Sequence, residues 1–148
     1  MILSKKSRYG LRALVDLSVH SKTEHMALNS IAERNGISAQ YLEQVFAALR
    51  RAGIVKSIKG PQGGYLLSRP AKDITVSEIV LALDGSYFVE DEESPAGCSV
   101  YGITETLQKM IIGPVNRNLD EVLKNITLED LERDFTENGA QAQDMYYI

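Results

Sequence analysis

The sequence predicts a mainly α-helical fold with one small two-stranded β hairpin. Three segments before residue 53 carry apolar residues at helical spacings of three and four. Two short β-branched runs then flank a glycine-rich segment, which is typical of a hairpin. Helical spacing of apolar residues returns after residue 110. With 148 residues and 44% hydrophobic content, the chain has room for one compact domain and an appendage.

The first helix is expected over residues 7–19. Tyr9, Leu11, Leu14, Val15 and either Ser18 or Val19 recur near one face of such a helix, and charged side chains lie elsewhere. This pattern predicts an amphipathic helix whose apolar stripe faces a core.

A tight turn is expected to join the next two helices. The first covers residues 28–34 and is ended by Asn35 and Gly36, since glycine accepts the left-handed conformation common at helix ends. Ser38 is placed to cap the second helix, over residues 38–52. The predicted buried stripe of that helix is Tyr41, Leu42, Val45, Phe46 and Leu49. The pair forms a helix-turn-helix.

A hairpin with a loose tip follows the helix-turn-helix. Residues 54–58 and 65–68 are the two β-branched runs, and glycines dominate residues 60–64 between them. The basic residues expected to flank the tip are Lys56, Lys59 and Arg69. Because the tip has little side-chain bulk, its backbone can approach a phosphate closely. The hairpin has the form of a DNA-binding wing.

Charge is divided unevenly along the chain. Residues 1–72 hold 12 Lys and Arg against four Asp and Glu, a net charge of +8. Residues 73–148 hold four against 16, a net charge of −12. A basic segment suits a polyanion, because each cation beside a phosphate displaces condensed counterions. Together with the helix-turn-helix and the wing, this charge predicts binding to double-stranded DNA.

Outward-facing residues of the third helix are expected to face base edges. Glutamine can pair with adenine, and glutamate can accept a hydrogen bond from cytosine. Tyr41 is either a core residue or a phosphate ligand. The candidate DNA-binding residues are Ser38, Ala39, Gln40, Tyr41, Glu43, Gln44, Arg50, Lys56, Lys59, Gly60, Gln62, Gly63 and Gly64.

Several motifs together resemble the Rrf2 family of bacterial winged-helix regulators. They are KSRYGLRAL (6–14), SIAE (30–33), SxxYLEQ (38–44), LRxAGIV (49–55), KGPxGGY (59–65) and ITLEDL (126–131). The resemblance covers nearly the whole chain. It implies a winged helix-turn-helix with a long dimerisation helix, and a homodimer that binds a pseudo-palindromic operator.

The acidic half is expected to contain two further helices. Thr75 and Glu78 form a capping box that opens a helix through Leu83. A later apolar seam consists of Ile111, Val115, Leu119, Val122 and Ile126. Its spacing predicts a helix that pairs with a partner copy, although packing on its own domain would give the same pattern. Pro114 either lies in the first turn of this helix or kinks a longer helix that starts near Thr104.

These features divide the chain into four parts. Residues 1–84 form the DNA-binding domain, 85–99 an acidic loop, 100–135 the dimerisation region and 136–148 a C-terminal tail.

Cys98 is the single cysteine of the chain, which excludes an intramolecular disulfide. Iron-sulfur members of the family carry three cysteines in this loop, because a cluster needs several thiolate ligands. The residues near the expected positions of the others are Glu92, Ser94, Ile103 and Thr104. We therefore predict no cofactor and no metal. Cys98 is either an inert exposed thiol or a redox-active one, and His20 and His25 are both expected to be solvated.

The chain's last four residues are apolar or aromatic after a polar stretch. They are Met145, Tyr146, Tyr147 and Ile148. They either cover the chain's own surface or form a linear motif for a partner's pocket. This ending resembles that of the family's cluster-free branch, which represses cysteine metabolism. That resemblance implies the cysteine synthase O-acetylserine thiol-lyase as a co-regulator.

Other functional classes find no support in the sequence. There is no triad of catalytic residues, no phosphate-binding loop and no metal-spaced histidine pair, so we predict that the chain is not an enzyme. No apolar run could span a bilayer, and we expect a bacterial cytoplasmic protein. Two functions remain: a repressor of cysteine and sulfur genes that senses a partner enzyme, or a regulator with its own iron-sulfur or thiol chemistry.

Overall fold

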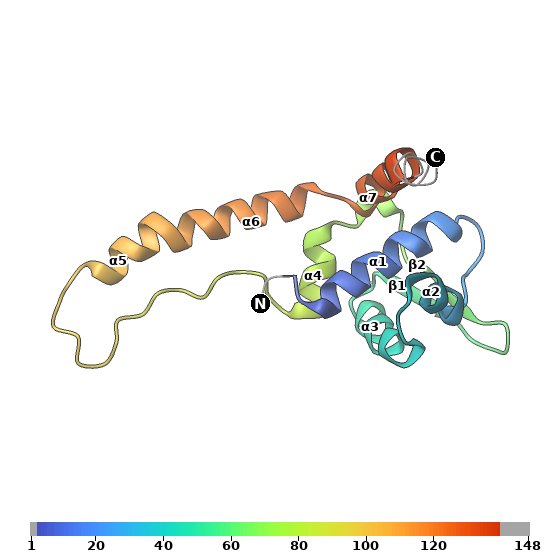
Figure 1. The fold of residues 1–148 in the computed structure, drawn as a ribbon, viewed down its shortest axis with the longest axis horizontal. Coiled ribbons are helices and arrows are strands. Elements are labelled where there is room, and N and C mark those ends of the chain that lie inside the picture. Colours follow the sequence, from blue (N-terminus) through green and yellow to red (C-terminus); the bar gives the residue numbers. More distant parts are fainter. Residues whose placement is uncertain (1–2, 140–148) are drawn as a thin grey trace, which may run out of the picture.

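The computed structural model describes residues 3–139. Three helices and a hairpin form the first half of the chain, and a helix beside the first one, a long helical rod and a short helix form the second (Figure 1). The first elements are α1 (Lys5–His20), α2 (Leu28–Asn35), α3 (Ala39–Arg51), β1 (Val55–Ile58) and β2 (Gly64–Leu67). They are followed by a 3-10 turn (Ala71–Asp73), α4 (Val76–Asp84), α5 (Ile103–Leu107), a π-helical turn (Gln108–Ile112), α6 (Gly113–Asn125), α7 (Leu128–Asp134) and a second π-helical turn (Phe135–Gly139). The mainly helical fold with one two-stranded sheet is confirmed.

Local capping sets the helix boundaries as the sequence predicted. Ser38 Oγ accepts a hydrogen bond from the Tyr41 amide at 3.1 Å and starts α3. Gly36 ends α2 in the left-handed region, with φ of 63°. Both reciprocal hydrogen bonds of the capping box between Thr75 and Glu78 are present at the start of α4. These residues act on neighbours three positions away, so their effect is visible in the sequence.

The main core lies between α1, α3 and α4. Its largest fully buried side chains include Leu14, Leu17, Leu42, Phe46 and Ile79. The predicted stripe of α3 is buried except for Tyr41, which is half-buried.

The buried face of α1 differs from the predicted one. Tyr9, Leu11 and Val15 are only half-buried. The fully buried residues of α1 are Ser7, Gly10, Ala13, Leu14, Leu17 and Ser18. Small residues on this face let α1 lie close to α4: a Cβ atom on Gly10 would meet the Leu83 side chain at 2.3 Å. Because α1 and α4 pack closely, small residues occupy the buried face of α1 in place of larger apolar ones.

The helix that ends at Asn125 begins well before Pro114. α5, the π-helical turn and α6 run as one continuous rod from Ile103 to Asn125 (Figure 1). Pro114 therefore lies inside a long helix that starts near Thr104, as the alternative interpretation held. Proline lacks an N–H group and its ring crowds the carbonyl four residues earlier. The wider π-helical turn comes directly before this proline, where it accommodates the lost hydrogen bond.

The base of the rod packs on α4 through a second, smaller core. Val76, Val80, Tyr87 and Leu123 are buried there, with Leu119 and Ile126 partly buried against them. The helix ends at Asn125, and the Ile126 carbonyl accepts a hydrogen bond from the Val76 amide at 2.8 Å. Among residues 3–139, no helix combines the length and apolar character needed to cross a bilayer.

The predicted dimer seam is thereby split. Leu119 and Ile126 pack against their own domain, as the alternative interpretation allowed. Ile111, Val115 and Val122 are 51%, 40% and 54% exposed.

Candidate nucleic-acid interface

The outward face of α3 is open to solvent. Ser38, Gln40, Glu43 and Gln44 are exposed, and Ala39 is half-buried. These residues lie on the first two turns of α3, while Leu42, Val45 and Phe46 anchor its other face in the core. The helix can therefore present short polar side chains to a groove without disturbing the domain.

Tyr41 lies at the edge of this face. Its ring packs edge-on against Tyr9, with ring centroids 5.7 Å apart and an interplanar angle of 87°. Lys5 Nζ lies 5.3 Å from the centroid of the Tyr9 ring. Tyr41 thus holds α3 against α1, and its predicted contact with phosphate stays a prediction.

The wing is an antiparallel pair beside α3. Val55 pairs with Leu67 at its base and Ile58 with Gly64 near its tip. Lys56, Lys59, Gly60 and Gln62 are exposed. Arg50 at the end of α3 is also exposed, and its Nη1 atom lies 3.5 Å from Ser57 Oγ on β1. Polar and basic groups of α3 and the wing therefore border one another.

Arg69 does not flank the tip as expected. Its guanidinium donates to the Asp73 carbonyl and pairs with Glu78 Oε2 at 3.0 Å. The side chain thus joins the end of the wing to α4, because the nearest carboxylate lies there.

Two wing glycines are required by the hairpin itself. A Cβ atom on Gly63 would lie 2.2 Å from the Ile58 carbonyl oxygen, and one on Gly64 would lie 2.3 Å from the Met26 carbonyl oxygen. Met26 pairs with Tyr65 through two backbone hydrogen bonds of 2.8 and 2.9 Å. The loop after α1 thus joins β2 through a single β-bridge, and this pairing over a long sequence separation has no sequence signal.

His25 contacts the wing tip, contrary to the expectation that it is solvated. Its Nε2 atom lies 2.5 Å from the Gln62 carbonyl oxygen and donates to it in the matching tautomer. His20 Nδ1 lies 2.9 Å from the Asp16 carbonyl oxygen and is exposed. The His25 contact braces the tip from the loop after α1.

Asp16 connects α1 to the helix-turn-helix. Arg34 donates to its carboxylate from Nε and Nη2, at 2.9 and 2.5 Å, and Asn35 Nδ2 donates at 3.1 Å. The hydrogen bond to Asp16 is the main reason that the pKa of Arg34 is raised. These bonds hold the end of α2, and with it the turn before α3, against α1.

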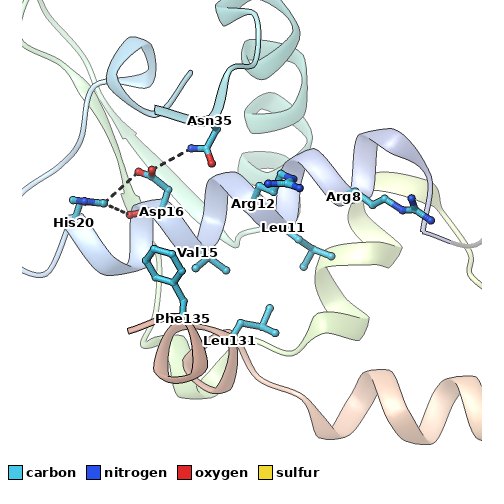
Figure 2. A pocket seen from close by; sticks show the side chains of 9 residues that line it. All are labelled: Arg8, Leu11, Arg12, Val15, Asp16, His20, Asn35, Leu131 and Phe135. Carbon is cyan, nitrogen blue, oxygen red and sulfur yellow. Dashed lines mark hydrogen bonds and ion pairs between the residues drawn. The ribbon is translucent and has the colours of Figure 1, made fainter. Parts of the chain in front are cut away.

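A groove of about 540 Å³ lies between α1 and the helix that follows the rod (Figure 2). Its lining residues are Arg8, Leu11, Arg12, Val15, Asp16, His20, Asn35, Leu131 and Phe135. Figure 2 shows Leu131 and Phe135 facing Leu11 and Val15 across it. This groove could not be predicted from the sequence, because α1 and α7 on its two sides are far apart along the chain.

Cys98 lies in the loop before α5. The thiol is exposed and donates to the Val100 carbonyl oxygen at 3.4 Å. Ser94 Oγ and Thr104 Oγ1 are 2.5 Å apart. Within residues 3–139, no three His, Cys, Asp or Glu side chains are close enough to hold a metal. A lone thiol does not match the ligand set of an iron-sulfur cluster, so the residues present do not fit one.

The predicted partner-binding residues, Met145, Tyr146, Tyr147 and Ile148, lie outside the described residues.

Comparison with known proteins identifies relatives over most of the chain. The family model Rrf2, described as an iron-dependent transcriptional regulator, matches residues 3–134. The HTH-type transcriptional regulator IscR of Klebsiella pneumoniae is 39% identical over 131 residues, which are 88% of this chain and 79% of that protein.

Solved structures of the same kind of regulator are also similar to this chain. IscR of T. potens is 37% identical, with a TM-score of 0.69 over 90% of this chain and 88% of that one. CymR of B. subtilis, titled the global cysteine regulator, is 34% identical, with a TM-score of 0.72 over 90% of this chain and 97% of that one. These relatives are regulators and not enzymes. The chain therefore belongs to the Rrf2 family of winged-helix, DNA-binding transcriptional regulators.

Proposed function

We propose that this chain is a homodimeric repressor that reads a pseudo-palindromic operator and controls genes of cysteine and sulfur metabolism. The observation that carries the DNA-reading part is the position of the exposed polar face of α3 beside a basic wing. Both lie on the segment with a net charge of +8.

In this proposal α3 enters the major groove. Gln40 and Gln44 are amides that can pair with adenine, and Glu43 can accept from cytosine. The exposed cations Arg50, Lys56 and Lys59 contact phosphates on either side, which positions α3 without selecting a sequence. Gln62 and the glycines of the wing tip, Gly60, Gly63 and Gly64, bring the backbone close to the duplex.

The rod provides the dimer contact. Large apolar side chains are exposed along its length: Ile103, Met110, Ile111, Val115 and Val122. A helix that exposes so much apolar surface in a monomer is expected to bury it against a second copy. The predicted parts of the chain then act in order: residues 1–84 bind DNA, 85–99 form the loop, 100–135 dimerise and 136–148 form the tail.

Two features support the proposal that this chain controls genes of cysteine metabolism. The chain has a single cysteine, too few for a cluster held by several thiolates, and CymR is among the proteins whose solved structures it resembles. By the resemblance of its ending, Met145 to Ile148 would bind O-acetylserine thiol-lyase. O-acetylserine, the substrate of that enzyme, would compete with the tail for the enzyme and thereby weaken operator binding.

The DNA-binding proposal is tested by fluorescence anisotropy with operator fragments and random duplexes at several salt concentrations. We expect a specific affinity well above the non-specific one, and a steep fall of both with salt. Equal affinity for every duplex would contradict sequence-specific reading.

The partner is tested by titrating O-acetylserine thiol-lyase with the full chain and with a chain that lacks Ile148. We expect binding that is lost without Ile148 and reversed by O-acetylserine. No binding by the full chain would contradict this part alone and leave DNA reading intact.

A second candidate signal is oxidation of Cys98, favoured by the exposure of its thiol. Mild oxidation would then change operator affinity in the parent protein and not in Cys98→Ser. An unchanged affinity in the parent would remove this candidate.

A further inference from the structure

We propose that Glu132 of α7 is a positioning residue for the wing. It fixes the α1–α2 loop, residues 21–27, and this loop in turn holds the hairpin of the wing in place. Figure 1 shows α7 lying against α1 on the side away from α3. Glu132 is therefore remote from the face proposed to meet DNA and acts on it through other residues. The inference rests on the proposed contact of the wing with DNA.

The carboxylate of Glu132 links α7 to the end of α1. Ser18 Oγ donates to Glu132 Oε2 at 2.5 Å, and the Lys22 ammonium donates to Oε1. Only 13% of the Glu132 side chain is exposed, whereas 62% of the Lys22 side chain is exposed. Burial alone would raise the pKa of Glu132, but the hydrogen bonds from Lys22 and Ser18 lower it overall, so the carboxylate is charged at neutral pH. A charged acceptor thus holds both donors.

The α7 helix is a firm support for this carboxylate. Leu128, one turn before Glu132, is fully buried in the main core. Its amide donates to the Ile74 carbonyl at 2.8 Å, and Thr127 and Asp130 form a capping box at the start of the helix. Residues four apart lie on the same face of a helix, so the burial of Leu128 turns Glu132 toward the domain.

The α1–α2 loop carries the link from Lys22 to the wing. Two residues separate Lys22 from His25. His25 Nε2 lies 2.5 Å from the Gln62 carbonyl oxygen at the wing tip, and Met26 shares two backbone hydrogen bonds with Tyr65 on β2. Because a short stretch of chain has little reach, a loop held at Lys22 is also held where it meets the hairpin.

The loop and the hairpin meet without spare room. A Cβ atom on Gly64 would lie 2.3 Å from the Met26 carbonyl oxygen. Since backbone meets backbone there, a shift of the loop is passed to β2 and to the tip. The exposed Lys56 and Lys59 belong to the same hairpin. Releasing the loop from Glu132 therefore displaces these lysines from the phosphates they are proposed to contact.

Glu132 is expected to contribute to DNA affinity more than to stability. An ion pair with a largely exposed lysine adds little to the free energy of unfolding. Glu132→Gln keeps an oxygen that can accept from Ser18 and removes the charge that holds Lys22. This variant therefore releases the loop while the contact between α7 and α1 is kept.

The test compares Glu132→Gln with Glu129→Gln in the full-length protein. Both remove one negative charge from α7, but the Glu129 carboxylate is exposed and pairs with Arg133 of the same helix at 3.2 Å. Fluorescence anisotropy is measured with an operator fragment and with a random duplex at several salt concentrations. We expect Glu132→Gln to bind both duplexes about threefold to tenfold more weakly than Glu129→Gln. Its salt slope should also be smaller, because the wing lysines no longer reach phosphates together.

A double-mutant cycle separates positioning from a general structural role. Lys59→Ala should cost less affinity in the Glu132→Gln background than in the parent, because the lysine is already displaced. Glu43→Ala should reduce discrimination equally in both backgrounds, since α3 is anchored by its own apolar face. Lys22→Met breaks the same link from the exposed partner and keeps an apolar stem. It should match Glu132→Gln, and the two changes together should cost no more than one.

Equal binding by Glu132→Gln and Glu129→Gln would overturn the positioning role. So would a cost of Lys59→Ala that Glu132→Gln leaves unchanged, or losses from Lys22→Met and Glu132→Gln that simply add. A parent protein that binds neither duplex would instead overturn the proposed contact with DNA.

Discussion

The buried phenol of Tyr87 donates a hydrogen bond to the Asp120 carboxylate at 2.5 Å and ties the segment just after α4 to the rod. Tyr87 is 1% exposed, and its Oη atom also lies 2.9 Å from Ser77 Oγ. Asp120 pairs in turn with Lys124 one turn along α6. The base of the rod is thus held by polar contacts as well as by the second core.

Replacing Tyr87 by Phe should lower the free energy of unfolding at pH 7 by about 1–2 kcal/mol, because the ring is kept and two hydrogen bonds are lost. Burial, and then the hydrogen bond to Asp120, raises the pKa of Tyr87 above its ordinary value. Stability from this group is therefore fully present below pH about 10 and falls as the pH rises toward the folded pKa.

Urea unfolding from pH 7 to 11 would measure both effects. The alkaline loss of stability should be smaller in Tyr87→Phe than in the parent. Tyr101→Phe, at a tyrosine that is 95% exposed, is the matched control and should match the parent. An identical alkaline slope in Tyr87→Phe would contradict the assignment.

Gly64→Ala should destabilise the wing. The new Cβ atom would lie 2.3 Å from the Met26 carbonyl oxygen, so the backbone pairing with Met26 must open. We expect a loss of about 1–3 kcal/mol in the free energy of unfolding. Gln62→Ala at the exposed tip is the control and should change stability by less than about 0.5 kcal/mol. Equal stability of the two variants would show that the bridge between Met26 and Tyr65 is dispensable.

Glu43→Ala and Lys59→Ala should affect DNA binding in different ways. Loss of the carboxylate should reduce discrimination at one base position by about 1–3 kcal/mol. Loss of the lysine should weaken all duplexes alike and reduce the salt slope by about one. Competition anisotropy with operator variants measures both quantities, and an unchanged specificity ratio in Glu43→Ala would reject its role in base reading.

Val115→Asp should weaken the dimer, because it places a charge in the exposed apolar stripe of the rod. Sedimentation equilibrium should show mostly monomer at concentrations where the parent is dimeric. Arg117→Asp, two positions away and about 200° around the helix, is the matched control and should leave the dimer intact. Dimers of equal strength in both variants would move the interface away from the rod.

Much of the candidate site could be predicted because its parts depend on neighbours in sequence. The Ser38 cap, the Gly36 turn and the apolar spacing of α3 act within one helical turn. The exposed polar face of α3 follows from the same spacing. Residue types also decide net charge, so the basic character of residues 1–72 needs no structure.

Contacts between distant segments could not be predicted in this way. No periodic pattern in the sequence indicates three of these contacts. They are the pairing of Met26 with Tyr65, the hydrogen bond from His25 to Gln62 and the hydrogen bonds of Asp16 to α2. The buried face of α1 depends on which elements surround it, and these include α4 and α7, which come much later in the chain.

Local propensity and composition account for the order of the elements, for α3 with its exposed polar face, for the wing and for the charge of each half. Tertiary structure alone decided that Leu119 and Ile126 pack inward while Val115 and Val122 stay exposed. It also decided that α7 returns to form a groove with α1. The physical reason is that apolar spacing shows that a face will be buried and does not show which surface will bury it.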